Sequence, residues 1–348
     1  MSLQEAIIKV QHGEHLARNE AREVMEHLLT GSASEDETVA LLLSLRDKGE
    51  QAAELIGFAE VMRWHAQETL RRAGVDIEAL SAEPLLDTCG TGGDGRGTFN
   101  VSTAAALVAA GAGARVAKHG NRSISSRVGS ADVLEALGVR VTLPIEQIPA
   151  CLDEVGMVFL FAPHLHVAMK HVMPARRRIK TKTVFNLLGP LTNPLAASMQ
   201  LAGVYDSGRT EMMAEALGAV GTRRALVVAG TDGLDEITTT GPTKLSDYHG
   251  DGVKTREITP EDFGLPRTEA RALAGGSAAE NARLLYQILQ GEKGPARDCV
   301  LANSAAALVA AGRASQWTAG VELAAEAIDS GAARRVLERL IEFTRRHG

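Results

Sequence analysis

A glycine-rich loop between a short apolar strand and a helix constrains the fold of this chain more than any other stretch. The expected strand covers residues 85–89, the loop covers residues 90–97, and a helix begins near Ser102. Glycines let backbone N–H groups approach an anion closely, and the helix start adds unpaired N–H groups and the positive end of a dipole. We therefore predict a phosphate-binding loop at a strand end in an α/β fold.

This loop fits neither of the common nucleotide-binding motifs. The Walker motif needs a lysine, whereas residues 90–95 read GTGGDG. Gly90, Gly92 and Gly95 have the spacing of the dinucleotide fingerprint, but no ribose-binding acid follows on a second strand about 20 residues later. A tight connection without a ligand is the alternative, which crowded polar side chains at the helix start disfavour. These are Thr98, Asn100, Ser102 and Thr103.

Strand and helix patterns alternate after residue 84 and predict a mainly parallel sheet covered by helices on both faces. The expected strands cover residues 85–89, 115–117, 139–141, 157–161, 199–205 and 225–229. The helices between them are expected to begin near Ser102, Ser130, Ile145 and Arg209. The polar segments 90–97 and 118–122 follow neighbouring strands, so they should face one cleft.

The first 64 residues carry helical patterns alone. Apolar residues recur at helical spacing from Leu3, from Ala21 and from Ala52. Ser34 and Glu37 have the spacing of a capping box, and glycines 31 and 49 are expected helix stops. We predict a small helical domain, and because its apolar stripes exceed what it can bury alone, we expect a homodimer through this face.

Composition narrows the class of function. A chain of 348 residues that is 45% hydrophobic can form one large domain with a smaller one. Its formal net charge of −6 argues against a non-specific nucleic-acid binder. Three distant cysteines without zinc-site spacing predict reduced thiols in a cytoplasmic protein, and we expect no membrane partner because every apolar run is too short. His164, His166 and His171 lack the acid or cysteine that would complete a metal site.

Three motifs resemble those of the anthranilate phosphoribosyltransferase family. They are DTCGTGGDG with the following TFN and ST (residues 87–103), KHGNRS through GSADVLEALGV (residues 118–139), and NLLGPLTNP (residues 186–194). The likeness extends over nearly the whole chain. It implies transfer of the phosphoribosyl group of 5-phosphoribosyl 1-pyrophosphate to the amine of anthranilate, a step of tryptophan biosynthesis.

The resemblance also implies the fold of nucleoside phosphorylases and phosphoribosyltransferases. In that arrangement residues 1–73 and 164–183 form a discontinuous helical domain. Residues 74–163 and 184–348 form the large α/β domain, which carries the phosphate-binding loop.

Site residues follow from the resemblance position by position. Those for phosphoribosyl pyrophosphate are Gly90, Gly93, Asp94, Thr98, Asn100, Val101, Ser102, Thr103, Lys118, His119, Gly120, Asn121, Arg122, Ser123, Ile124, Ser125, Ser126 and Ser130. Those for anthranilate are Gly90, Asn121 and Arg176. Those for Mg²⁺, expected as two ions per subunit, are Ser102, Asp235 and Glu236.

The residues themselves give these assignments a chemical rationale. Asp235 and Glu236 are adjacent acids after a strand, which suits Mg²⁺, although an exposed, solvated acidic pair is the alternative. An arginine fork pairs naturally with a carboxylate, although residues 176–178 could equally be a charged helix face. We expect no catalytic acid or base, because an aromatic amine is already neutral and nucleophilic at pH 7 and positioning can supply the rate.

Departures from the family pattern are local. Family members commonly have glycine and arginine where Lys180 and Lys182 stand, and lysine and a small residue where Arg127 and Val128 stand. Two other functions remain open. A nucleoside phosphorylase would leave the acidic pair and residues 118–122 less well explained, and a nucleic-acid-binding paralogue using the basic run 176–182 conflicts with the net acidity.

Overall fold

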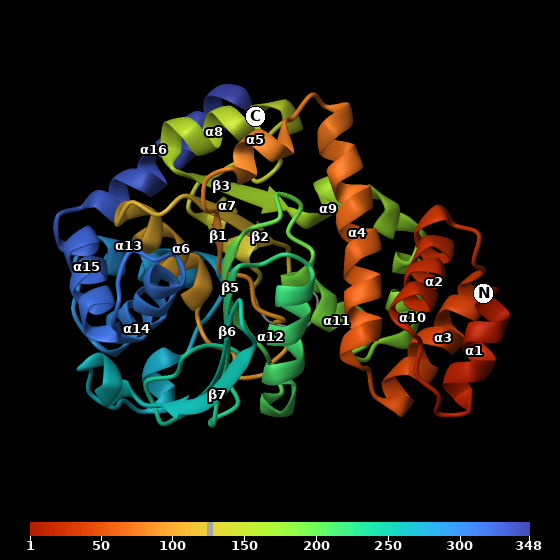
Figure 1. Cartoon of the computed structure of the whole chain (residues 1–348). Helices are drawn as coiled ribbons and strands as arrows, with labels where there is room; N and C mark the ends of the chain where they lie inside the picture. Colours follow the sequence, from red (N-terminus) through yellow and green to blue (C-terminus); the bar gives the residue numbers. More distant parts are fainter. Residues whose placement is uncertain (124–127) are drawn as a thin grey trace.

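The structure, a computed structural model, describes residues 1–123 and 128–348 and contains a helical unit beside a larger α/β unit (Figure 1). The long helix α4 stands between the N-terminal helices and the sheet (Figure 1). Within the described residues, no helix combines the length and the apolar character needed to cross a bilayer.

The helical unit confirms the N-terminal prediction. It begins with α1 (Leu3–Gln11), α2 (Arg18–Thr30), α3 (Glu35–Lys48) and α4 (Ala52–Arg72). The Ser34 hydroxyl accepts the Glu37 N–H, and the Glu37 carboxylate accepts the Ser34 N–H, so the expected capping box starts α3. Glycines 31 and 49 end α2 and α3, as expected.

The chain returns to the helical unit after β3. The segments η2 (Val167–His171) and α10 (Met173–Ile179) pack against α2 and α3, and Val172 belongs to the same apolar core as the first four helices. Boundaries of the small domain at residues 73, 164 and 183 stay a prediction.

A seven-stranded sheet forms the centre of the α/β unit, in the order β3-β2-β1-β4-β5-β6-β7. The first five strands of this order pair in parallel, and β6 and β7 add an antiparallel hairpin at one edge. The strands are β1 (Leu86–Asp87), β2 (Val116–Gly120), β3 (Met157–Phe161), β4 (Met199–Gly203), β5 (Arg224–Gly230), β6 (Thr243–His249) and β7 (Val253–Ile258).

The predicted strand at residues 139–141 is wrong. Both valines there are buried, but the Val139 N–H donates to the Leu134 carbonyl and the Arg140 N–H donates to the Thr344 hydroxyl. These backbone groups therefore bond to helices and not to a strand. The β6–β7 hairpin was not predicted, because β6 is rich in polar residues and β7 is mostly exposed.

Helices cover both faces of the sheet, which confirms the predicted architecture. Side chains of β5 alternate between two apolar cores: Leu226 and Val228 join one, and Ala225, Val227 and Ala229 join the other. The second core is continuous with the helical unit. The remaining α-helices are α5 (Ile77–Ser81), α6 (Val101–Gly111), α7 (Ser130–Ala136), α8 (Ile148–Val155), α9 (Ala162–Leu165), α11 (Val184–Leu188), α12 (Thr210–Ala219), α13 (Ala278–Leu289), α14 (Pro295–Ala310), α15 (Trp317–Asp329) and α16 (Ala332–His347).

The strand order reverses at β1. The chain runs from β1 to β2 and β3 on one side of the sheet and continues with β4 and β5 on the other. In open α/β sheets a ligand crevice forms outside the carboxyl ends of the strands at such a switch point. The glycine-rich loop follows β1, so the fold places it at this position.

Candidate functional site

A cavity of about 790 Å³ lies between the two units, at the carboxyl ends of the central strands. Its walls come from the glycine-rich loop, the end of β2, the segment 162–177, the start of α11 and the acids at 235 and 236. Segments far apart in the sequence therefore meet around one space.

The glycine-rich loop is tied to the strand beside it. The Thr91 N–H donates to the Gly203 carbonyl at 2.8 Å, and Gly92 and Gly93 have φ angles of 63° and 76°, which favour glycine. A Cβ on Gly203 would lie 1.5 Å from the Asp235 carbonyl oxygen, so the acidic loop passes directly over the end of β4. Glycine at 203 allows this close approach.

The acidic pair is held by the glycine-rich loop and by α6. The Asp235 carboxylate accepts the Gly92 N–H at 2.7 Å, and the Glu236 carboxylate accepts the Ser102 N–H at 3.1 Å. Burial raises the pKa of both carboxyls, and the neighbouring Asp94 raises the pKa of Asp235 further. The alternative of an exposed, solvated acidic pair therefore does not hold, because both residues are partly buried and both carboxylates are hydrogen-bonded.

Lys118 supplies a buried cation at the end of β2. Lys118 is 1% exposed. Its Nζ donates to the Thr88 carbonyl at 2.8 Å and lies 3.4 Å from the Ser102 hydroxyl. The lysine lines the cavity together with the acidic pair. Opposite charges thus lie near the start of α6.

A buried polar cluster that was not predicted from the sequence lies between β1, β2 and Asn193. Strands β1 and β2 share a short backbone ladder. They are also joined by the Asp87 carboxylate, which accepts the backbone N–H of His119 at 3.1 Å. The Asn193 side chain donates to Asp87 and to the Ala117 carbonyl, each at 2.8 Å. Asp87 and Asn193 lie inside the quoted motifs, which were the available signal.

Two buried histidines lie side by side at the wall of the cavity. The ring centroids of His119 and His166 are 5.1 Å apart. Burial lowers the pKa of His119 to about 3 and that of His166 to about 4, so both rings are neutral at pH 7. His166 was missed as a cavity residue.

Arg176 faces the cavity from α10. Its guanidinium carbon lies 5.2 Å from the centroid of the Phe185 ring, and burial lowers its pKa. No acid pairs with it among residues 1–123 and 128–348, whereas the nearby Arg178 pairs with Asp36 at 2.6 Å on the surface. The alternative of a charged helix face therefore describes Arg178 and not Arg176.

The structure brings most of the expected donor-site residues together. Those that line the cavity are Gly90, Gly93, Asp94, Thr98, Asn100, Ser102, Lys118, His119, Gly120, Asn121, Arg122, Ser123 and Ser130. Val101 and Thr103 are buried in α6 and do not line it. The Arg122 guanidinium is engaged by Glu135 at 2.7 Å and by Asp132. Ile124, Ser125, Ser126 and Arg127 lie outside the described residues.

Comparisons with known proteins match both units. The glycosyl transferase family α/β domain matches residues 82–334, and the helical bundle domain of the same family matches residues 4–66. An anthranilate phosphoribosyltransferase of Moorella thermoacetica is 52% identical, over 98% of this chain and 98% of its own. The chain belongs to the anthranilate phosphoribosyltransferase family.

Solved structures of anthranilate phosphoribosyltransferases share the whole fold. The enzyme of Thermus thermophilus is 43% identical with a TM-score of 0.87, covering 98% of this chain and 99% of its own. The Saccharomyces cerevisiae enzyme in complex with PRPP and Mg is 29% identical with a TM-score of 0.87, over 99% and 98% of the two chains. The yeast enzyme has also been solved with 4-fluoroanthranilate, at 27% identity, a TM-score of 0.84 and 99% coverage of both chains.

Three of the positions that depart from the pattern of anthranilate phosphoribosyltransferases lie in the described residues. Lys180 ends α10 with a φ of 54°, in the left-handed region that favours the glycine common there. The Lys182 ammonium lies 3.5 Å from the centroid of the Tyr205 ring, a position that a cation of either type can take. The carbonyl of Val128 accepts the Asn100 side-chain N–H at 3.1 Å, so the backbone of that position carries the contact.

Proposed function

We propose that the cavity binds both substrates of this family's reaction, with the donor at the glycine-rich loop and the acceptor at Arg176. As a family member the chain is a pentosyltransferase of tryptophan biosynthesis. It transfers the phosphoribosyl group of 5-phosphoribosyl 1-pyrophosphate to the amine of anthranilate, giving N-(5-phosphoribosyl)anthranilate and pyrophosphate.

The donor end suits a diphosphate with Mg²⁺. Asp235, Glu236 and the Ser102 hydroxyl offer the hard oxygen ligands that Mg²⁺ prefers, and substrate oxygens would complete the set. The raised pKa values of the two acids fit this role, because crowded, partly buried carboxylates lack a sufficient counter-charge. When bound, Mg²⁺ would neutralise charge on the diphosphate, and we propose two ions per subunit. Lys118 would add a fixed positive charge beside them.

The acceptor end suits an aromatic carboxylate. Arg176 carries a cation without an acidic partner among the described residues, beside the face of Phe185. A guanidinium can bind a carboxylate through two parallel N–H bonds, and partial burial strengthens that pair. Asn121 and Gly90 line the same cavity and would contact anthranilate from the donor side.

Catalysis by these residues would rest on alignment and charge. The amine needs no base, and the neutral rings of His119 and His166 add no positive charge beside a ribose carbon that becomes cationic. The groups at the two ends of the cavity would hold the diphosphate and the acceptor carboxylate, so that the amine meets the ribose carbon between them.

The observation that carries the proposal is the position of Arg176, which has no acidic partner among residues 1–123 and 128–348 and faces the same cavity as the glycine-rich loop and the acidic pair. The test is to mix purified protein with phosphoribosyl pyrophosphate, Mg²⁺ and anthranilate and to follow the loss of anthranilate fluorescence. Phosphorolysis of pyrimidine nucleosides without that loss would favour the phosphorylase, and binding of nucleic acid without either activity would favour the paralogue.

We also propose that the protein is a cytoplasmic homodimer. Ile8 and Trp64, on helices of the helical unit, are 48% and 52% exposed, which favours a partner surface there. The three cysteines are buried and unpaired, as is usual in a reducing compartment. Sedimentation at micromolar concentration tests the dimer.

A further inference from the structure

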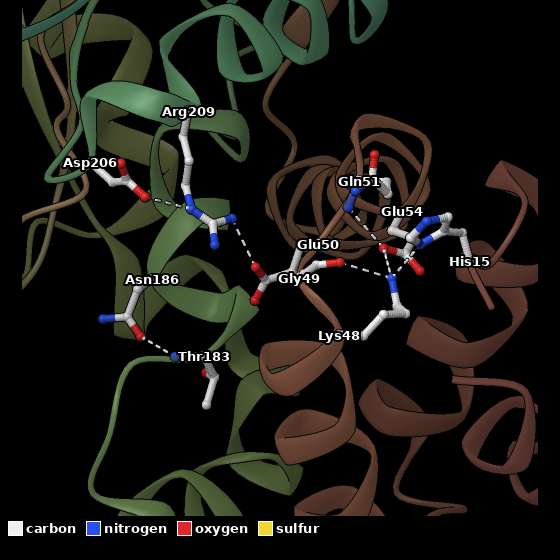
Figure 2. A network of polar contacts seen from close by, with 10 residues as sticks. All are labelled: His15, Lys48, Gly49, Glu50, Gln51, Glu54, Thr183, Asn186, Asp206 and Arg209. Atoms are coloured by element: carbon white, nitrogen blue, oxygen red, sulfur yellow. Dashed lines mark hydrogen bonds and ion pairs between the residues drawn. The ribbon is translucent and has the colours of Figure 1, made fainter. Parts of the chain in front are cut away.

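A network of charged side chains joins the helical unit to the α/β unit at one edge of their interface (Figure 2). Its first part stiffens the corner between α3 and α4. Lys48 and Glu54 form an ion pair of 2.9 Å with side chains 3% and 0% exposed. The Glu54 carboxylate also accepts the N–H groups of Leu16 and Gln51, each at 2.9 Å. The residue between them in this corner, Glu50, is therefore held on a rigid support.

Glu50 reaches from this corner to the α/β unit. Its carboxylate lies 2.8 Å from Nη1 of Arg209, and Figure 2 shows the arginine extending toward it from the start of α12. Glu50 is 6% exposed, so its carboxylate is shielded from water, whereas the Arg209 side chain is 23% exposed. The other side of the guanidinium, Nε, donates to Asp206 at 3.3 Å. Arg209 thus fixes the segment 203–209 to the helical unit.

The same segment holds the glycine-rich loop. The Tyr205 N–H donates to the Thr91 hydroxyl at 3.1 Å, and the Thr91 N–H donates to the Gly203 carbonyl at 2.8 Å. The Lys182 ammonium also contacts this segment, because it lies over the Tyr205 ring at 3.5 Å from the ring centroid. Lys182 follows α10, the helix that carries Arg176. Segment 203–209 is therefore bonded both to the donor loop and to the support of the acceptor end.

We propose that Glu50 and Arg209 are positioning residues for the transfer reaction. Neither lines the cavity, and they act through segment 203–209 to fix the glycine-rich loop relative to Arg176. A misalignment of about 1 Å between reactants can lower the rate about a hundredfold. Loss of this ion pair should therefore lower kcat more than it weakens the binding of either substrate. The inference rests on the proposed function.

Glu50→Gln tests this role, because the amide keeps the shape and removes the charge. We expect kcat to fall about tenfold, with the KM values of both substrates within about threefold of wild type. Arg209→Gln should lower kcat similarly, and the double variant should be no slower than the slower single variant, since one interaction is lost in all three.

Asp329→Asn is the matched control. It breaks the pair of Asp329 with the buried Arg297 at 2.6 Å, which lies in the C-terminal helices and not at the cavity. This variant should lower the thermal midpoint and leave kcat unchanged. A kcat for Glu50→Gln within twofold of wild type, an equal fall in Asp329→Asn, or an effect confined to one KM would overturn the positioning role.

Hydrogen exchange separates this inference from the proposed function. Glu50→Gln should speed amide exchange in residues 90–97, which Glu50 does not touch, and Asp329→Asn should not. Unchanged exchange there contradicts the coupling even if the enzyme is active. Absence of turnover in the unsubstituted protein contradicts the proposed function instead, and the exchange result then decides the coupling alone.

Discussion

The donor end and the acceptor end of the cavity are built in opposite ways. At the donor end, Asp235, Glu236 and Lys118 are all hydrogen-bonded to backbone or hydroxyl groups of the glycine-rich loop, the end of β1 and the start of α6. At the acceptor end, Arg176 has a ring and no acid beside it, within the described residues. The donor groups are thus preorganised by their neighbours, whereas the acceptor group is left free for a ligand.

The acids should show the largest effect on the donor end. Asp235→Asn with Glu236→Gln should lower Mg²⁺-dependent turnover by at least about a hundredfold, because the hard oxygen charges are lost. The amides can still accept the two backbone N–H bonds, so the thermal midpoint of the ligand-free protein should not fall. Steady-state rates across Mg²⁺ concentrations measure the first effect. Turnover within twofold of wild type would remove the metal assignment.

A side chain in the glycine-rich loop should have the next largest effect. Gly93 has a φ of 76°, so Gly93→Val strains the loop and adds bulk where the diphosphate should bind. We expect phosphoribosyl pyrophosphate to bind at least about tenfold more weakly, as measured by calorimetry. Gly13→Val is the control, because Gly13 has a φ of 79° in the helical unit and open space around it. Equal donor binding in the two variants would place the diphosphate elsewhere.

Arg176 tests the acceptor end alone. Arg176→Ala should raise the anthranilate KM about tenfold or more, because a charge-assisted pair is lost, and donor binding should change little. Arg176→Lys should recover part of the loss, since an ammonium lacks the forked geometry. Arg178→Ala removes a neighbouring cation that is already paired on the surface, and it should have no effect. Equal weakening of both substrates by Arg176→Ala would contradict the division into two ends.

The buried histidines should show the smallest effect, on stability. Their pKa values are lowered from the ordinary 6.5 to about 3 and about 4, so the unfolded chain binds more protons below pH 6.5. The contribution of these neutral rings to the free energy of unfolding is therefore complete above about pH 6.5. It falls as the pH drops toward 4, by up to about 1.4 kcal/mol per pH unit for each ring. Urea unfolding at pH 7 and pH 5 measures it. His166→Gln should flatten this dependence, and His12→Gln, at an exposed site, should not.

The same contrast separates what the sequence could predict from what it could not. The glycine-rich loop, the strand before it and α6 are contiguous in the sequence. The phosphate-binding loop could therefore be predicted from local sequence. Arg176 was placed only by resemblance, because α10 returns to the helical unit through contacts that no local pattern records. The hydrogen bond between Asp87 and Asn193 was not predicted, because it joins residues 106 positions apart in the sequence.

Errors in the predicted elements have the same origin. The alternating valines at residues 139–141 are typical of a strand. The backbone N–H of Arg140, which lies between them, instead donates to the hydroxyl of Thr344, far along the chain. For the acids at 235 and 236, local sequence left a solvated pair open as the alternative, because adjacent carboxylates are usually solvated. Their burial comes from the loop that crosses the end of β4 at Gly203, a contact between segments that local sequence does not specify.

A crystal structure with phosphoribosyl pyrophosphate, Mg²⁺ and an unreactive anthranilate analogue tests the two-ended cavity most directly. The account predicts the diphosphate in the glycine-rich loop, with Mg²⁺ on Asp235 and Glu236. It predicts the analogue's carboxylate on the guanidinium of Arg176, with the ring between Arg176 and the donor ribose. A diphosphate on Arg176, or an analogue bound without contact to that residue, would contradict it.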